Sequence, residues 1–415
     1  MERKHGAGAW LLFAVLGALG SLLISACGSS AVEVANTLVP TLNGQAGNFD
    51  NIEIDQGNHR LYVADRTDQG VDVFDISAAT AKFIKTIALS SPPNGLAISS
   101  DYRLYAGMAS GSVAMIDINK SSPSLHTVVA EVKTGGTRVD LLDYNGPNHM
   151  LLASNGADGS ITSIDTITNE IKDQFKVGSA LEQPRFNGGD GLIYVTSPDA
   201  DALIQIDPKD GTIKNTFALG GCNPTGLAIN VQANSAVIAC KSYVISRDLK
   251  TDKTQKFDQV VGGDIVNYNA KVDRFFVASP HKTRPSVIGM FGGSPITYIS
   301  SIAAPGAGNS AVLDETNDSV YSPDTRPSQS GVSGTPRLSS LQSASPATIA
   351  MYAAAAVVFA VVFLFVMRKG DPIQRRGPAP TPAAELAPAV KPMRSWRRTQ
   401  VEPAIEGPPA PSVQP

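Results

Sequence analysis

Short runs of β-branched and aromatic residues recur between residues 49 and 322, and polar turns rich in Gly, Asn and Asp separate them. Seven such runs are Leu61–Ala64, Leu104–Gly107, Leu151–Ser154, Ile193–Thr196, Ala236–Ala239, Phe275–Ala278 and Ser319–Ser322. The intervals between their first residues are 43, 47, 42, 43, 39 and 44. Apolar runs of this length bounded by turn residues predict β-strands. Their near-constant spacing predicts a repeat architecture.

A second strand follows each run at a near-constant offset and usually ends in aspartate, as in Val71–Asp75 and Val113–Asp117. We interpret these aspartates as turn builders whose carboxylates accept backbone N–H groups. A third strand precedes each run and twice begins with Pro-x-Gly-Leu-Ala, at Pro93–Ala97 and Pro224–Ala228. Without helical periodicity, this pattern predicts an all-β chain, a seven-bladed β-propeller over residues 31–322 with four strands per blade.

The last blade lacks one strand within this range. The segment Glu33–Asn43 carries Thr37-Leu38-Val39, which resembles the outer strand Lys85–Leu89 of the first blade. We therefore expect an N-terminal strand to close the ring, in one blade built from both ends of the chain. Closure of this kind removes free sheet edges, which would otherwise pair with other chains.

The N-terminus has the pattern of an export signal. Basic residues, Arg3-Lys4, precede an apolar run that ends in Ile24-Ser25-Ala26 and leads into Cys27. Small residues before a cysteine resemble a bacterial lipoprotein signal, so residues 1–26 are predicted to be a signal peptide and Cys27 a lipidation site. An ordinary cleaved signal with an accidental cysteine, or an uncleaved anchor, is the alternative.

A second apolar segment lies near the C-terminus. Residues 347–367 are 21 residues without a charge, about 31 Å long as a helix, which matches a bilayer core. Arg368-Lys369 follow directly. Basic flanks stay cytoplasmic, so we predict a single transmembrane helix in the cell membrane, with the propeller extracytoplasmic. Residues 323–346 are interpreted as a Ser/Pro-rich stalk, and residues 368–415 as a disordered Pro/Arg-rich cytoplasmic tail. A lipid at Cys27 would be a redundant second anchor.

Composition excludes several classes of protein. The 415 residues include 5 His and 3 Cys, too few for a metal-cluster protein or a disulfide scaffold. The formal net charge of -3 gives no reason to expect nucleic acid. Charge is uneven, because residues 27–367 hold 24 Lys/Arg against 32 Asp/Glu while the tail is basic. The exported part is therefore acidic.

The repeat resembles a known family. Leu61–Ala64, Val71–Asp75 and Pro93–Ala97 are similar to the repeats of YVTN-type propellers, close to the YncE-like bacterial surface and periplasmic proteins. The resemblance covers roughly residues 47–322 and implies the propeller fold. It implies little about activity, since the repeat residues build strands and turns. Most members of this group are unassigned binding proteins, and distant relatives include lactonases and quinone-dependent dehydrogenases.

Ligands of propellers bind mostly around the mouth of the central channel, where the first strands of the blades start. Alignment of the repeats places seven polar residues around that rim: Asp50, Asn94, Arg138, Arg185, Thr225, Asp264 and Asn309. Two acids, two arginines and three neutral polar groups can hold a small polar ligand or a peptide. Polar residues are also needed at any solvated channel mouth, and this alternative stays open.

No sequence motif identifies a catalytic centre. The chain has no Gly-x-Ser-x-Gly elbow, Walker loop or His-Glu-x-x-His, so no catalytic or metal-ligating residue is predicted and the cofactor is unknown. The hypothesis is a membrane-anchored monomer that acts as a binding platform for an extracytoplasmic protein, wall polymer or small ligand, and not for nucleic acid. The alternative is an enzyme with its site in the channel mouth, a metal-assisted lactonase or a quinone-dependent dehydrogenase.

Cys222 and Cys240 flank the two inner strands of the predicted fifth blade. The start of one antiparallel strand lies near the end of the next, so the two thiols can pair across the hairpin. A disulfide would close a 19-residue loop and stabilise an exported domain by about 3 kcal/mol. Two free buried thiols is the alternative.

Overall fold

The computed structural model describes residues 35–335, apart from residues 79, 179, 282–285, 305 and 307. The predicted signal peptide, Cys27, the transmembrane segment 347–367 and the cytoplasmic tail lie outside the described residues. Within the described range, no helix is long and apolar enough to cross a membrane.

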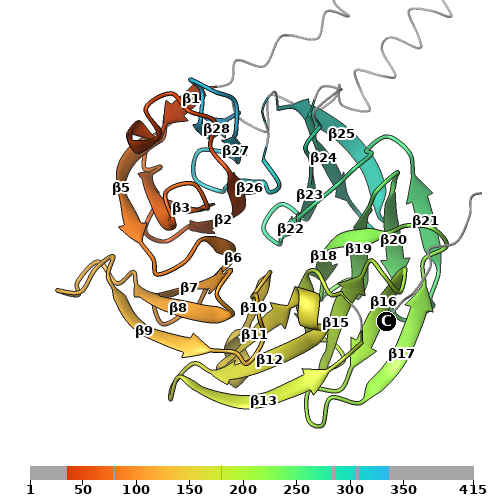
Figure 1. Ribbon diagram of the computed structural model, residues 1–415. Helices are drawn as coiled ribbons and strands as arrows, with labels where there is room; N and C mark the ends of the chain where they lie inside the picture. The colour runs from red at the N-terminus through yellow and green to blue at the C-terminus, as the bar shows by residue number, and fades with distance from the viewer. Residues whose placement is uncertain are drawn as a thin grey trace, which may run out of the picture. The chain divides into compact units, whose positions relative to one another are not determined.

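The described residues form seven four-stranded antiparallel sheets arranged as the blades of a ring (Figure 1). Blade one is β2 (Phe49–Asp55), β3 (Arg60–Asp65), β4 (Gly70–Asp75) and β5 (Lys82–Ala88). Blade two is β6 (Pro93–Ile98), β7 (Arg103–Met108), β8 (Ser112–Asp117) and β9 (Val128–Lys133). Blade three is β10 (Leu142–Asn145), β11 (Met150–Asn155), β12 (Ser160–Asp165) and β13 (Glu170–Lys176). Blade four is β14 (Pro184–Asn187), β15 (Leu192–Ser197), β16 (Ala202–Ile206) and β17 (Ile213–Ala218).

Blade five is β18 (Pro224–Asn230), β19 (Ser235–Cys240), β20 (Val244–Asp248) and β21 (Thr254–Phe257). Blade six is β22 (Val266–Asn269), β23 (Arg274–Ser279), β24 (Val287–Gly292) and β25 (Thr297–Ala303). Blade seven is β26 (Val312–Asp314), β27 (Ser319–Asp324), β28 (Gly331–Gly334) and β1 (Ala35–Leu38). In the described range, three short 3-10 turns occur at Pro40–Leu42, Gly146–Asn148 and Gly156–Asp158. The predicted seven-bladed, all-β propeller is confirmed.

The core lies between the blades. In blade one the second strand, β3, is almost entirely buried, whereas most residues of the outer strand β5 are exposed or half-buried. One cluster packs Tyr62 and Val71 of blade one against Leu96 and Leu104 of blade two. Each sheet is therefore covered on its faces by its neighbours, which explains why the second strands are apolar at nearly every position.

In five blades an aspartate ends, or directly follows, the third strand in chain order (β4, β8, β12, β16 and β20), and it builds the turn that comes next. In five blades the carboxylate accepts the backbone N–H two residues further on, at 2.8–3.0 Å. These aspartates are Asp75, Asp117, Asp165, Asp207 and Asp248. The predicted structural role in the turns is confirmed.

Blade seven closes the ring with strands from both ends of the chain. Strand β1 pairs antiparallel with β28, with Ala35 opposite Gly334, as the segment Glu33–Asn43 led us to expect. The propeller continues past the predicted boundary at residue 322, because Gly331–Gly334 form β28 instead of part of a stalk. Ser and Gly at these positions suggested a linker, but here they are buried and their backbone is paired on both sides.

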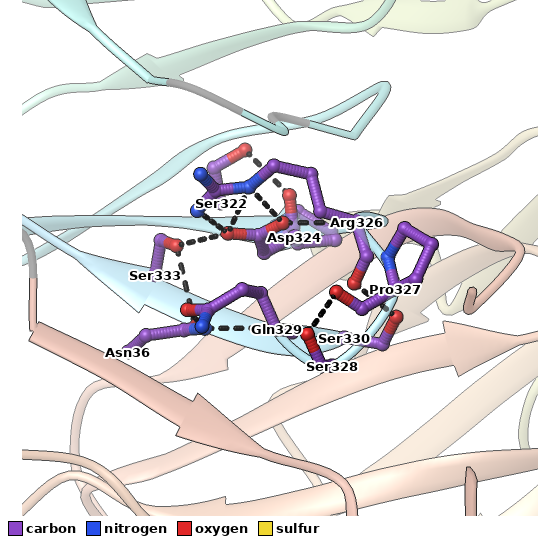
Figure 2. Close-up of polar contacts among 10 residues, drawn as sticks. Asn36, Ser322, Asp324, Arg326, Pro327, Ser328, Gln329, Ser330 and Ser333 are labelled. Atoms are coloured by element: carbon purple, nitrogen blue, oxygen red, sulfur yellow. Dashed lines mark hydrogen bonds and ion pairs between the residues drawn. The ribbon is translucent and has the colours of Figure 1, made fainter. Parts of the chain in front are cut away.

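Side chains reinforce this closure (Figure 2). The fully buried Asp324 carboxylate accepts hydrogen bonds from Arg326 Nε at 3.0 Å and Nη2 at 2.5 Å, and from Ser333 Oγ at 3.1 Å. Asn36 Nδ2, on β1, donates to the Gln329 carbonyl at 2.7 Å and to its side-chain oxygen at 2.9 Å. The Asp324 contacts stiffen the β27–β28 hairpin itself, and the neutral Asn36 hydrogen bonds fix the N-terminal strand to that hairpin in addition to its ladder.

Candidate functional site

Seven polar residues occupy one equivalent position in the seven blades. In blade one this position is Asp50, two residues before Ile52, which pairs with Val63 on the second strand. The strand pairing of the other six blades identifies the residue equivalent to Ile52, and the mouth residue lies two positions before it. This set, called the mouth ring from here on, is Asp50, Asn94, Asp140, Glu182, Thr225, Asp264 and Asn309. The inner strands β2, β6, β10, β14, β18, β22 and β26 surround the centre of the ring in Figure 1, and each mouth-ring residue lies within three residues of the start of its strand.

The Pro-x-Gly-Leu-Ala motif explains part of this geometry. The inner strands β6 and β18 each carry a one-residue bulge just before their leucine, at the position of the motif glycine. A Cβ on Gly95 would collide with the Asp140 carbonyl oxygen, and a Cβ on Gly226 would collide with that of Asp264. Only glycine lets the inner strand approach the next blade this closely, so the motif sets the spacing of the mouth ring.

The structure places five of the seven predicted rim residues in the mouth ring: Asp50, Asn94, Thr225, Asp264 and Asn309. Arg138 comes two residues before the ring position of blade three, and Arg185 comes three residues after that of blade four. The ring residues there are Asp140 and Glu182, and their placement corrects the predicted alignment. The ring position lies 11 residues before Leu151 and Ile193, as it does before Leu61, so these two blades keep the repeat from which the predicted alignment departed.

Two ring carboxylates have arginine partners. Arg66, which follows β3, forms an ion pair with Asp50 and donates through Nε to the Asn94 side-chain oxygen at 2.9 Å. Arg138 donates to Asp140 Oδ1 at 2.7 Å. Arg138 therefore contributes to the mouth after all, as a partner of a ring residue. Sequence patterns could not identify Arg66, because only blade five has a basic residue, Lys241, at the equivalent position.

The other two ring acids have no such partner. Within the described part of the chain, no ion pair or hydrogen bond reaches the carboxyl group of Glu182 or Asp264. Thr225 is turned toward the backbone and donates to the Gly263 carbonyl at 2.9 Å. The mouth thus combines two neutralised acids with two open ones.

Burial and mutual repulsion raise the pKa values of the ring acids. Burial, followed by the nearby Asp140 and Asp264 carboxylates, raises the pKa of Glu182 to about 8. Burial, followed by Asp50 and Asp140, raises the pKa of Asp264 to about 7. The pKa of Asp50 reaches only about 6, because Arg66 opposes the effect of burial. Four carboxyl groups that influence one another's ionisation share one small, partly desolvated space.

This arrangement favours a positively charged ligand. A bound cation would relieve the repulsion among the carboxylates and supply the partner that Glu182 and Asp264 lack. Among the described residues, no three or more His, Cys, Asp or Glu side chains are arranged to hold a metal ion. The ring therefore fits an organic cation, whose N–H groups can reach carboxylates that lie apart, better than a metal ion, which needs its oxygen ligands close together.

A disulfide joins Cys222 and Cys240 in blade five, with Cα atoms 4.8 Å apart. The bond links the start of β18 to the end of β19 and is fully buried. It lies on the chain just before Thr225, so it stiffens the segment that enters the mouth ring. Its role here is structural.

Comparison with known proteins identifies the fold only. No protein-family model matches the chain, and no curated protein matches it. A chain of the structure titled "Crystal Structure of Mitotic Checkpoint Complex" superposes with a TM-score of 0.58 and 14% sequence identity, covering 73% of this chain and 90% of that chain. In all, 1626 chains of solved structures match, so the fold is widespread and does not decide the function.

Proposed function

We propose that this protein is a binding platform whose channel mouth receives a cationic group, an ammonium or guanidinium, presented by a partner protein or peptide. The observation that carries the proposal is the pair of open carboxyl groups, Glu182 and Asp264, beside the neutralised Asp50 and Asp140. A lysine or arginine side chain in the mouth would form charge-assisted hydrogen bonds with both open acids.

The rest of the mouth supports a partner of this kind. Asn94 and Asn309 are amides beside Asp50, and Asn309 Nδ2 lies 3.4 Å from its Oδ1. Blades joined by inter-blade cores give a rigid rim, which lowers the entropy lost on binding. Propeller folds often serve as interaction surfaces, and the similar chain of the mitotic checkpoint complex belongs to a multiprotein assembly by its title. That likeness supports a platform and says nothing about the partner.

The setting of the protein is also part of the proposal. The signal-like N-terminus, the apolar segment 347–367 and the basic residues after it support a propeller held on the outer side of a bacterial cell membrane, with a lipid on Cys27 as a further anchor. The Cys222–Cys240 disulfide is compatible with an oxidising compartment. The repeats support membership of the YVTN-type, YncE-like propellers.

An enzyme remains the second candidate. A Glu182 pKa of about 8 and an Asp264 pKa of about 7 are typical of groups that exchange protons at neutral pH. On this hypothesis the protonated Glu182 would act as a general acid on a ligand in the mouth. The same variants test both candidates, because hydrolysis of a lactone would be lost together with the carboxyl group.

The test is a titration of the full-length protein in detergent micelles with a trilysine peptide at pH 8. We expect binding that weakens with salt and falls at least tenfold in the Glu182→Gln and Asp264→Asn variants. Glu170→Gln, at an exposed position on β13, is the matched control and should bind like the parent. Equal binding by all four proteins would exclude the mouth as the cation site.

A further inference from the structure

A second set of polar residues lies deeper in the channel. Three residues along the inner strands from the mouth ring, the equivalent position is held by Glu53, Asp143, Arg185 and Asn267 in blades one, three, four and six. Arg185, predicted for the mouth, belongs to this level. The other three were not singled out by the sequence.

Two buried amides separate the levels. Gln183 directly precedes β14, and its side chain reaches the next two blades, where its oxygen accepts the Leu227 N–H at 2.7 Å and its nitrogen donates to the Val266 carbonyl at 3.2 Å. Asn51 donates to the Leu96 carbonyl at 3.1 Å. Both amides come from chain positions between the two levels, so we treat the deeper residues as a compartment separate from the mouth.

That compartment contains a pocket of about 280 Å³. Residues from the inner strands of six blades line it, which places it on the axis of the ring. Its walls include the aromatic rings of Tyr144 and Tyr268 and the aliphatic Ile98 and Ile229. The volume lies near the lower end of the roughly 300–1,000 Å³ typical of small-molecule sites, so the ligand is small.

The pocket displays charges of both signs. Arg185 Nη1 lies 3.3 Å from Asp143 Oδ1, and Nη2 lies 3.4 Å from the Val266 carbonyl. Nη1 also donates to the Leu142 carbonyl at 3.3 Å and to the Pro184 carbonyl at 3.2 Å. All four contacts lie at or beyond the long end of the usual hydrogen-bond range, so the guanidinium keeps donor capacity. Glu53 has no ion pair in the part of the chain that the structure describes, and it shares the pocket with this guanidinium. A carboxyl whose hydrogen-bond partner is the Asn51 side chain and an incompletely satisfied guanidinium thus face the same small space.

We propose that this pocket binds a small zwitterion, an α-amino acid with an uncharged side chain. Arg185 would receive the α-carboxylate, and Glu53 would receive the α-ammonium. Tyr144, Tyr268 and the two isoleucines would contact the side chain. A neutral sugar would leave the charges of Glu53 and Arg185 uncompensated, and a simple cation would leave the guanidinium unused, so neither fits as well.

The ionisation of Glu53 gives this site a second signature. Burial, opposed by Arg185 and reinforced by Asp143, raises the pKa of Glu53 to about 7. Arg185 and Asp143 are the charged groups that face it, from β14 and β10. A bound ammonium favours the carboxylate, so binding at pH 7 should release protons, and the measured heat should depend on the ionisation enthalpy of the buffer.

The experiment is isothermal titration of the full-length protein in detergent micelles with each L-amino acid that has an uncharged side chain. We expect at least one to bind, with at least tenfold weaker binding of its N-acetyl and amide derivatives. Glu53→Gln should weaken binding at least tenfold and abolish the proton release. Arg185→Lys, which keeps the charge and loses the planar fork, should weaken it too.

Controls distinguish this proposal from the one for the mouth. Glu182→Gln should leave amino-acid binding unchanged, and Glu53→Gln should leave trilysine binding unchanged, with melting temperatures near that of the parent. Binding that survives N-acetylation and amidation, or binding of glucose in place of any amino acid, would overturn the proposal. The absence of binding by every amino acid tested would overturn it as well.

Discussion

The mouth ring carries a stability cost that depends on pH, and replacing Asp264 with Asn should remove it. Asp264 has a pKa of about 7 in the folded protein against an ordinary value of 3.8. The unfolded chain therefore loses this proton first as pH rises, and the folded state loses stability between about pH 4 and pH 7. Below pH 4 both states are protonated and the cost is absent. Above pH 7 it is constant.

The magnitude follows from the two pKa values. Each tenfold change in proton affinity is worth about 1.4 kcal/mol, so the difference between 3.8 and about 7 sets an upper limit of about 4 kcal/mol. The side chain is only partly buried, and water screens part of the repulsion, so we expect ~2 kcal/mol. For a propeller of this size, that corresponds to roughly 3 °C in Tm.

The assay is thermal unfolding of the parent and the Asp264→Asn variant, monitored by far-UV circular dichroism at a series of pH values from 4 to 9. The two melting temperatures should coincide near pH 4, and the variant should melt higher by roughly 3 °C above pH 7. Asp199→Asn, at an exposed turn, is the matched control and should show no such trend. A variant that is less stable than the parent at pH 8, or a difference that does not change with pH, would refute the reasoning.

Three further outcomes follow from the geometry. Replacing Cys222 and Cys240 together by Ala should lower the free energy of unfolding by about 3 kcal/mol, since the two cysteines are 18 residues apart in the chain. A non-reducing peptide map of the parent checks the bond itself. An unchanged thermal melt of the variant would contradict the prediction. Asp324→Asn breaks a fully buried charged contact, so it should lower the free energy of unfolding by about 3 kcal/mol. Urea unfolding measures this loss, and faster proteolysis near the chain ends should accompany it. Gly226→Ala should lower the Tm by several degrees because the added Cβ has no room. Gly57→Ala is the control and should leave the Tm unchanged, since its Cβ would meet only one atom, at 3.6 Å. Equal effects of the two variants would contradict the packing argument.

The blades were predictable because each repeat is a local pattern. Alternation of apolar strands and polar turns determines where a chain pairs with itself, and the spacing of Leu61 and its equivalents determines the number of blades. The strand β28 escaped prediction because Gly331–Gly334 has no apolar run. Its place depends on pairing with β1, almost 300 residues earlier, and local composition carries no sign of that contact.

The mouth ring was predictable in part. A constant interval of 10 or 11 residues before Leu61 and its equivalents would have found Asp140 and Glu182 as well as the five residues that were placed correctly. Arg66 and Gln183 could not be found this way. Each has a role that depends on the approach of different blades across the channel, which is a property of the closed ring and of no single repeat.

The closing ladder also determines how the propeller would respond to force. Because Ala35 lies opposite Gly334, the first and last described strands leave their sheet at the same end. A pull that separates the two chain ends would load the four residue pairs of this ladder one after another, as in peeling, and not all at once as in shear. Peeling needs far less force. Under tension blade seven would open first, the Asn36 contacts with Gln329 would break early, and the Leu38–Gly331 pair would be the last of the ladder to separate.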